Sequence, residues 1–510
     1  MKYRNLIIAA CVSIALVSCK KTTWLNVNTN PNSLPSSTPD FTFAAAANRV
    51  ASTLGPNELG SYWSGQWTQS STYIISNTIF AYQFNNTNFN YWSGYYDILE
   101  DLQYAIDGAA AKGQPYFGGI ARVMKAYVYQ QLVDIYGNLP YTDALKGTGS
   151  LAPKFDDQKA IYEDLVKVLD TAITILKANP LASAIAGSDI VFGASAATAA
   201  TKWIQFANSL KLRILIRQSR ITGRDAYIIA EINKAAAVTE GFLPAGLDVA
   251  SNPGYVASTG KLNPFYETWG YNAAGGVQAL GRYPRPTTFL FSSLIATKDT
   301  FRMKRLFYPK GGQGVNPEII TNYVGVPFGI GSGYLSQNTS YVGPSQLVKG
   351  EFNRPMILMT NAEVQFLLAE AKQRYGAAIT PALTAQAYYE QGVKESFRLT
   401  GTTTAYGAAT ATTLLTSAID LADWTASPDK LKAIWMQKWI ALTNYNGLEA
   451  WSEFRRTNFP VTPPSVSTSA TQALPKRLFY PQAEQVANGA NVSAQGTIDV
   501  FTSKLFWDVD

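Results

Sequence analysis

The stretch SPDKLKAIWMQKWIALTNYNGLEAWSEFRRTNFP, residues Ser427 to Pro460, carries the clearest structural pattern in this sequence. Ser427 is a residue type that caps helices, and Pro428 suits the first turn of a helix. The apolar residues that follow recur at roughly helical spacing; they are Leu431, Ile434, Trp435, Ile440 and Leu442. The pattern therefore predicts a helix with one apolar face.

A second short helix is predicted after the break at Asn446 and Gly447, and it carries the aromatic residues Trp451 and Phe454. Its charged residues also lie at helical spacing; they are Glu449, Glu453, Arg455 and Arg456. Because paired charges on helices usually fix packing, we expect these residues to tie the helix to its neighbour, and the pattern favours this structural role over a catalytic one.

Composition bounds the function of the chain. With 510 residues, 47% of them hydrophobic, it can bury a large core, and its net charge of +7 is too small and too scattered to indicate nucleic-acid binding. Histidine is absent, which excludes a Ser-His-Asp or Cys-His centre and a histidine zinc site. The two cysteines, Cys11 and Cys19, lie near the N-terminus, so the body of the chain has no disulfide, thiolate nucleophile or cysteine-bound metal. We expect no metal and no cofactor.

The N-terminus has the pattern of a targeting segment. Lys2 and Arg4 precede the apolar run 6–17, which is too short to span a bilayer and predicts a signal peptide over residues 1–18. Residues 16–19, LVSC, resemble a bacterial lipobox, which implies that Cys19 is acylated and anchors the protein to a membrane. The alternative is an ordinary secretory leader with an incidental cysteine. If Cys19 is acylated, residues 19–40 form a lipidated tether.

Several further segments read as helix pairs. Residues 91–111 and 115–136 have helical periodicity, with a break between them at Gly113 and Pro115. Asp156 is expected to cap a helix that ends at Asn179-Pro180, and another helix carries Trp203 to Arg217. Thr360 and Glu363 form a capping-box pattern, and a partner helix is predicted over 381–399.

Between about 242 and 350 the helical periodicity fades, and Gly, Pro, Asn and Tyr dominate. We expect a loop-rich region with a few short strands. The glycines at 329, 331 and 333 do not complete a nucleotide-binding GxGxxG motif, since position 334 is Tyr.

Motifs along nearly the whole mature chain resemble the SusD/RagB family of lipoproteins, in particular its SusD-like 2 group. They are Gln437-Lys438-Trp439, Glu449-Ala450-Trp451 and Arg455-Arg456-Thr457, together with YGNLPY at 136–141, KW and FANSLKLR within 202–213, TNAEVQFLLAEA at 360–371, YYEQGVKES at 388–396, and PKRLFYP at 475–481. The resemblance implies a mostly α fold of tetratricopeptide-like helix pairs in a right-handed superhelix, with a loop-rich lobe. It also implies one SusD-like domain over residues 41–510.

By the same resemblance, the protein is expected to be a non-catalytic nutrient-binding lipoprotein on the outer membrane, exposed at the cell surface. Such a protein captures glycans, or in some members peptides, and delivers them to a SusC-like TonB-dependent transporter. Lys20 and Lys21 follow Cys19, whereas acidic residues at these positions often mark surface export in such lipoproteins. The sequence departs from the family's pattern at this point.

Aromatic side chains that stack on sugars, and amides that bond their hydroxyls, are the expected ligand contacts. Aromatic residues are densest over 62–96, and the central loops add Trp269, Tyr271 and Tyr283. The residues we predict to contact ligand are Tyr73, Asn86, Trp92, Trp269 and Tyr283.

Two other function classes stay open at this stage. One is a surface glycoside hydrolase, which needs two carboxylates and no histidine. Asp97 with Glu100, or Glu363 with Glu370, are the candidate pairs. The other is a purely structural surface protein, which would bind no ligand saturably.

Overall fold

Paired helices make up most of this protein, whose computed structural model describes residues 37–73, 76–401, 404–470 and 473–509. Cys19, the predicted signal peptide and the predicted tether up to residue 36 lie outside the described residues. The following account concerns the unit Pro39–Asp510. None of the helices in the described ranges is both long enough and apolar enough to cross a membrane.

The first group of helices packs in sequence order, because each helix buries an apolar stripe on the next. α5 packs on α6, α6 on α7, α7 on α8, and α8 on α9, while α2 lies across α5 and α6. Their bounds are α2 (Pro39–Leu54), α5 (Trp92–Ala109), α6 (Pro115–Tyr136), α7 (Gln158–Ala178), α8 (Ala196–Arg217) and α9 (Asp225–Ala236).

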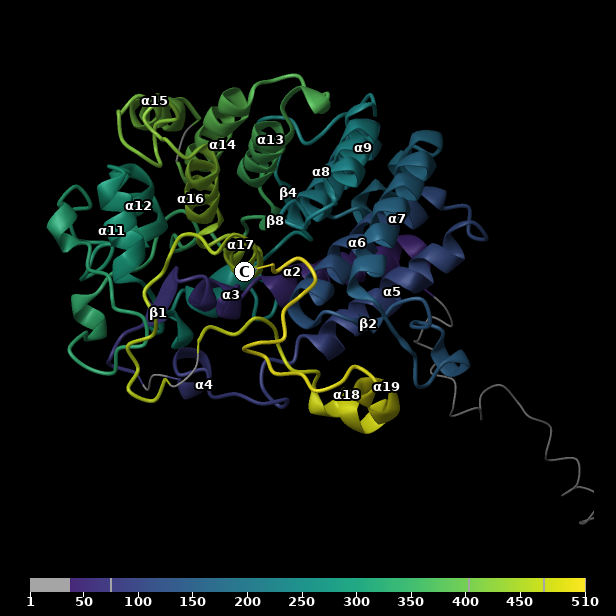
Figure 1. Ribbon diagram of the computed structural model, residues 1–510, viewed down its shortest axis with the longest axis horizontal. Helices are drawn as coiled ribbons and strands as arrows, with labels where there is room; N and C mark the ends of the chain where they lie inside the picture. Colours follow the sequence, from purple (N-terminus) through teal and green to yellow (C-terminus); the bar gives the residue numbers. More distant parts are fainter. Residues whose placement is uncertain (1–36, 74–75, 402–403, 471–472, 510) are drawn as a thin grey trace, which may run out of the picture. The chain divides into compact units, whose positions relative to one another are not determined.

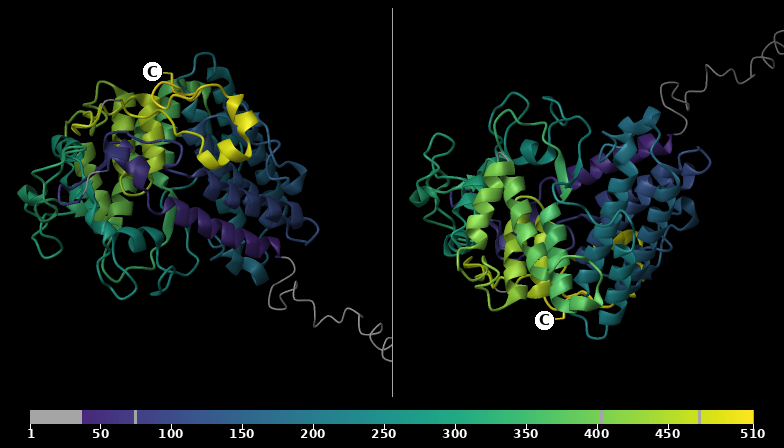
Figure 2. Two further views of the ribbon diagram at one scale, coloured as in Figure 1. Left: turned by 90° about the horizontal axis from the view of Figure 1, so that it is seen from below. Right: turned by 90° about the horizontal axis from the view of Figure 1, so that it is seen from above.

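The second group is built in the same way from the C-terminal part of the chain. α13 packs on α14 and α16, α14 on α15, and α16 on α17, while a further contact between α13 and α8 joins the two groups. In Figures 1 and 2 the two groups lie beside each other. The bounds are α13 (Asn361–Tyr375), α14 (Ala385–Thr400), α15 (Thr404–Leu415), α16 (Lys430–Leu442) and α17 (Gly447–Thr457). The predicted tetratricopeptide-like superhelix of helix pairs with few short strands is confirmed.

The remaining elements are short. They are the helices α3 (Glu58–Trp63), α4 (Asn77–Phe80), α10 (Pro264–Trp269), α11 (Thr288–Ala296), α12 (Thr300–Leu306), α18 (Gln482–Ala487) and α19 (Gly489–Ser493), and the strands β1 (Trp67–Gln69), β2 (Leu139–Pro140), β3 (Phe155–Asp156), β4 (Val249–Ser251), β5 (Pro284–Pro286), β6 (Phe307–Tyr308), β7 (Tyr341–Val342) and β8 (Met356–Met359). The strands pair antiparallel as β1 with β5, β2 with β3, β4 with β8, and β6 with β7. Most of the short elements between α9 and α13 belong to the loop-rich lobe.

Two expected helix caps are wrong by one or two residues. Asp429 rather than Ser427 caps α16, because the Ser427 hydroxyl donates to the Asp423 carbonyl and accepts from the Leu421 amide. Asp157 rather than its neighbour Asp156 caps α7. In both cases an aspartate one or two residues after the expected one accepts the capping hydrogen bonds.

Other helix ends agree with the sequence more closely. The Thr360 hydroxyl accepts from the Glu363 amide, which confirms it as the cap of α13. The Glu363 carboxylate, however, does not complete a capping box: it binds Arg213 of α8 in the core, with N···O distances of 2.6 and 2.8 Å. The partner helix α14 begins at Ala385 rather than Pro381, and Thr384 caps it.

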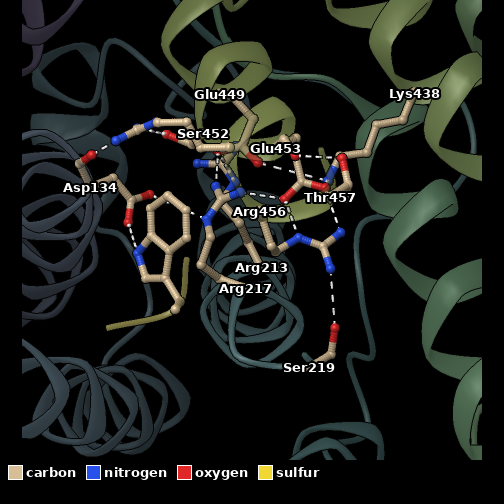
Figure 3. A network of polar contacts seen from close by, with 12 residues as sticks. Asp134, Arg213, Arg217, Ser219, Lys438, Glu449, Ser452, Glu453, Arg456 and Thr457 are labelled. Carbon is tan, nitrogen blue, oxygen red and sulfur yellow. Dashed lines mark hydrogen bonds and ion pairs between the residues drawn. The ribbon is translucent and has the colours of Figure 1, made fainter. Parts of the chain in front are cut away.

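A buried network of charges joins the two helix groups (Figure 3). Its members come from α6, α8, α13, α16 and α17, and the side chain of each is at most 11% exposed. The carboxylates are Asp134, Glu363, Glu370, Glu449 and Glu453, and the cations are Arg213, Arg217, Lys438 and Arg456. The expected ion pairs of Glu449, Glu453 and Arg456 are therefore present and lie in the core of the unit, whereas Arg455 donates to the backbone carbonyls of Asp134 and Lys476.

Two arginines illustrate how the network crosses between helices. Arg456 of α17 forms a fork with Glu370 of α13, at 2.8 and 2.7 Å. Arg217 of α8 bonds Glu453 and also Glu449 of α17, the latter at 2.5 Å. Guanidinium groups suit such sites because they bind carboxylates with two parallel hydrogen bonds.

The same network shifts the pKa of its acids in opposite directions. Burial raises the pKa of Glu370, but the charges of Arg456 and Arg374 outweigh it and lower the pKa to about 2. For Glu363, burial outweighs the charge of Arg213 and raises the pKa. The position of each carboxylate relative to the cations therefore decides which effect prevails.

The motif Gln437-Lys438-Trp439 of α16 connects three parts of the molecule. Gln437 accepts a hydrogen bond from Arg302 of α12 in the loop-rich lobe. Lys438 lies 3.1 Å from Glu453 in the charge network. Trp439 donates from Nε1 to the Ser64 carbonyl, just after α3, at 2.9 Å. Three consecutive side chains thus hold the lobe, the network and the first short helices to one another.

We predict that Glu370→Gln destabilises the protein by about 3–5 kcal/mol at pH 7, because it leaves the Arg456 guanidinium buried without one of its two carboxylates. Urea unfolding measures this loss. The control, Glu318→Gln, removes the charge of a side chain that is 71% exposed and paired with Lys304, and it should cost at most about 1 kcal/mol.

The pH dependence of the same variant tests the cause. A carboxyl with a lowered pKa stabilises the fold above its ordinary value of 4.5 and loses that contribution as the pH falls toward about 2. The difference in stability between the wild type and Glu370→Gln should therefore narrow below about pH 4.5. A difference that stays constant down to pH 2 would contradict this assignment.

Candidate functional site

Cavities of about 670, 530 and 380 Å³ open on the described part of the chain. The first contains one aromatic ring, Tyr255. The second borders the core rings Tyr62 and Trp63 and the half-buried rings Phe328 and Phe454. The third lies in the loop-rich lobe and is lined by four half-buried tyrosines, so it offers a ligand more accessible rings than the other two, each with a hydroxyl group.

We call this third cavity the tyrosine pocket. Its aromatic residues are Tyr73, Trp269, Tyr271, Tyr308 and Tyr341; its polar lining residues are Arg282, Arg285, Ser336 and Gln337. The lining comes from loops and short strands that are distant in sequence. The pocket is therefore a product of the tertiary fold.

Two small sheets position the rings. Tyr308 of β6 and Tyr341 of β7 are direct partners in the strand register, and their ring centroids lie 5.2 Å apart. Cross-strand aromatic pairs of this kind stabilise short antiparallel ribbons. β7 also contacts β5, which pairs with β1 and carries Arg285. The two ribbons thus bring the tyrosine pair and the arginine to one cavity.

The polar groups of the pocket are partly engaged. Tyr308 donates from its hydroxyl to the Leu347 carbonyl at 2.8 Å, and the Tyr271 hydroxyl accepts from Gln313 at 2.6 Å. Burial raises the pKa of both tyrosines, so their hydroxyls are neutral at physiological pH. Neutral hydroxyls can donate and accept hydrogen bonds to a ligand.

Gly312 fits closely against this wall. Its φ is +97°, in the region that favours glycine, and a Cβ there would lie 2.8 Å from the Tyr341 hydroxyl oxygen. The position therefore needs glycine both for its backbone and for the space beside Tyr341.

The structure brings three of the five predicted ligand residues together. Tyr73 lines the pocket, and Tyr283 packs against it with ring centroids 4.6 Å apart and ring planes tilted by 32°. Trp269 also lines the pocket but is only 4% exposed, and its Nε1 donates to the Pro56 carbonyl. It contributes mainly to the wall.

The other two predicted residues lie elsewhere. Trp92 begins α5 and packs among Tyr96, Tyr136, Phe155 and Tyr480. Asn86 donates to the side chain of Gln485 in α18. Neither lines the tyrosine pocket.

The sequence reasoning did not select Tyr308, Tyr341 or Arg285. The pairing of β6 with β7 was not visible in two-residue strands separated by a long loop. Arg285 stands between Pro284 and Pro286, a pattern that permits an extended edge strand but does not show where its side chain lies.

The carboxylate pairs of the hydrolase alternative are not arranged around this pocket. Glu363 and Glu370 are fully buried and bind Arg213 and Arg456. Asp97 and Glu100 lie on the exposed face of α5. No carboxylate of the described residues lines the tyrosine pocket, and the described chain holds no cluster of acidic side chains that could bind a metal.

Comparisons with known proteins agree with this fold. Residues 31–481 match the sequence profile of the SusD-like 2 family, described as "Starch-binding associating with outer membrane". The fold is similar to that of a SusD homologue from Bacteroides fragilis, with a TM-score of 0.75 and 21% identity over 93% of this chain and 100% of that one.

It is also similar to the fold of a chitin-binding SusD homologue from Flavobacterium johnsoniae, with a TM-score of 0.67 and 22% identity over 92% of this chain and 99% of that one. At these identities the similarity shows the fold alone. A comparison with curated protein sequences gives no match.

We predict that Gly312→Ala destabilises the protein by about 1–3 kcal/mol, because alanine at a positive φ is strained and its methyl group meets Tyr341. Gly314→Ala is the matched control in the same loop, since a Cβ there meets nothing within 4 Å. Equilibrium unfolding of both variants measures the difference. Equal stabilities would show that the loop does not pack against the pocket wall as described.

Proposed function

We propose that this chain, which belongs to the SusD-like 2 family, binds an oligosaccharide in its tyrosine pocket without cleaving it. The observation that supports this proposal is the wall of half-buried rings, Tyr73, Tyr271, Tyr308 and Tyr341, around a cavity of about 380 Å³. Aromatic faces stack on the apolar faces of sugar rings. The volume falls within the range of small-ligand sites.

The polar lining also favours binding over catalysis. Glycoside hydrolysis needs two carboxyl groups placed on either side of the scissile bond. The described lining of the pocket offers hydroxyl, amide and guanidinium groups instead. These groups hold a sugar through hydrogen bonds but do not supply the general acid and nucleophile of a hydrolase.

We also propose where the protein is located and which protein it works with. Membership of a family described as associating with the outer membrane supports that location. The resemblance of residues 16–19 to a lipobox supports an anchor at Cys19, and exposure at the cell surface is part of the same proposal. In this role the protein delivers its cargo to a SusC-like TonB-dependent transporter. Peptides are the alternative cargo, and the binding experiment below includes them.

Tyr271→Ala should lower the affinity for a bound oligosaccharide by about tenfold, through loss of one stacking face. The affinities are measured by calorimetry with a panel of candidate ligands. The panel contains starch, chitin, galactan and uronate oligosaccharides and mixed short peptides. Tyr104→Ala is the control, because Tyr104 is an exposed tyrosine of α5 outside the pocket.

The proposal fails if no saccharide of the panel binds or if peptides alone bind. It fails equally if the Tyr271→Ala variant binds as tightly as the wild type. An oligosaccharide released in shortened form at enzymatic rates would support the hydrolase alternative.

A second prediction concerns the anchor. Cys19→Ala should move the protein from the membrane fraction to the soluble fraction, because acyl chains on Cys19 supply the buried methylene groups that hold it to the bilayer. Ser18→Ala is the matched control and should stay with the membranes. Fractionation with detection of the mature chain measures both. Unchanged membrane partition of Cys19→Ala would remove Cys19 as the anchor.

A further inference from the structure

The tyrosine pocket is lined by two arginines and by no carboxylate of the described chain. Arg282 is exposed at the end of a short turn, and Arg285 of β5 is only 4% exposed. The charge on this cavity is therefore positive. A pocket for neutral sugars has no need of a buried cation, because desolvating a charge without a partner is costly.

Arg285 differs from the buried arginines that form ion pairs. Arg213, Arg217 and Arg456 bind carboxylates in the charge network, and Arg302 pairs with Asp299. Arg285 has only neutral partners among the described residues. Its Nε donates to the Thr339 hydroxyl at 3.0 Å and its Nη1 to the Pro284 carbonyl at 2.7 Å.

The groups around Arg285 are also neutral. Burial lowers its pKa to about 10, and the groups that oppose this effect are the hydroxyls of Tyr73, Tyr62 and Tyr341. The side chain is therefore still charged at neutral pH. Arg455 and Arg477 are also buried and have neutral hydrogen-bond partners. Both lie outside the tyrosine pocket, and Arg455 lines the second cavity.

A guanidinium group has five N–H donors, of which the hydrogen bonds above use two. A carboxylate or sulfate group can accept two parallel bonds from such a fork. Because Tyr73 and Tyr341 border both Arg285 and the cavity, a sugar stacked on these rings would place a ring substituent near the guanidinium.

We infer that the tyrosine pocket takes an acidic glycan, whose uronate carboxylate or sulfate ester is bound by Arg285 with Arg282 at the rim. The inference rests on the proposed function and adds the class of sugar to it. Carboxylate and sulfate share the same recognition chemistry, so the experiment distinguishes the two sources.

The experiment compares matched pairs of ligands on the mature chain. The first pair is trigalacturonate and its methyl ester, and the second is a sulfated galactotriose and galactotriose. The acidic member of at least one pair should bind about tenfold or more tighter than its neutral partner. This preference should shrink as salt increases, since salt screens the exposed Arg282.

Variants then assign the preference to the pocket. Arg285→Gln should remove most of it, and Arg285→Lys should keep part of it, because lysine keeps the charge but not the fork. Arg282→Gln changes an exposed side chain and should weaken acidic ligands by about threefold more than it weakens neutral ones. Arg49→Gln, whose side chain is 55% exposed and pairs with Asp101, is the control.

The outcomes distinguish a preference for acidic glycans from the proposed binding of glycans in general. Neutral sugars that bind as tightly as their acidic partners, with no effect of Arg282→Gln, would overturn the acidic preference and leave glycan binding standing. An acidic preference that is undiminished in both Arg282→Gln and Arg285→Gln would also overturn it. Failure of every saccharide to bind would overturn the proposed function as well.

Discussion

The buried charge network at α17 is the constraint on which the rest of this fold depends. Burying ions is costly unless each finds a partner with good geometry, so carboxylates and cations from five helices can be satisfied together only when those helices are correctly placed. Arg456 needs Glu370 of α13, and Arg217 of α8 needs Glu449 of α17. The network therefore fixes the register between the two helix groups, which a continuous apolar interface would leave less specific.

From that centre, α16 extends the constraint to the loop-rich lobe. Gln437 accepts a hydrogen bond from Arg302 of α12. Asn444, just beyond the end of α16, accepts a hydrogen bond from Trp67 of β1 and donates one to the Leu306 carbonyl. The lobe has few regular elements of its own, so these bonds supply part of the order that its short strands lack. A rigid helical scaffold thus holds an irregular surface on which the tyrosine pocket is formed, which is a common division between scaffold and binding loops.

Sequence alone predicted the scaffold much better than the pocket. The helix over Pro115–Tyr136 was expected at its observed bounds, because apolar periodicity and a proline in the first turn are local signals. Trp92 looked like a ligand contact in the same aromatic-rich stretch as Tyr73, yet it packs in the core; local sequence cannot tell which ring finds a partner. Tyr341 reaches the pocket through its pairing with Tyr308, a long-range contact with no local signal.

We propose that the protein recognises sugars at these tyrosines and not at another cavity of the molecule. A crystal structure of the mature chain, with the oligosaccharide that binds it most tightly, decides between the cavities. We expect a sugar ring stacked on Tyr271 or Tyr341, with its polar substituents toward Arg285. A sugar seated instead in the cavity at Tyr255, with the tyrosine pocket filled by solvent, would contradict it.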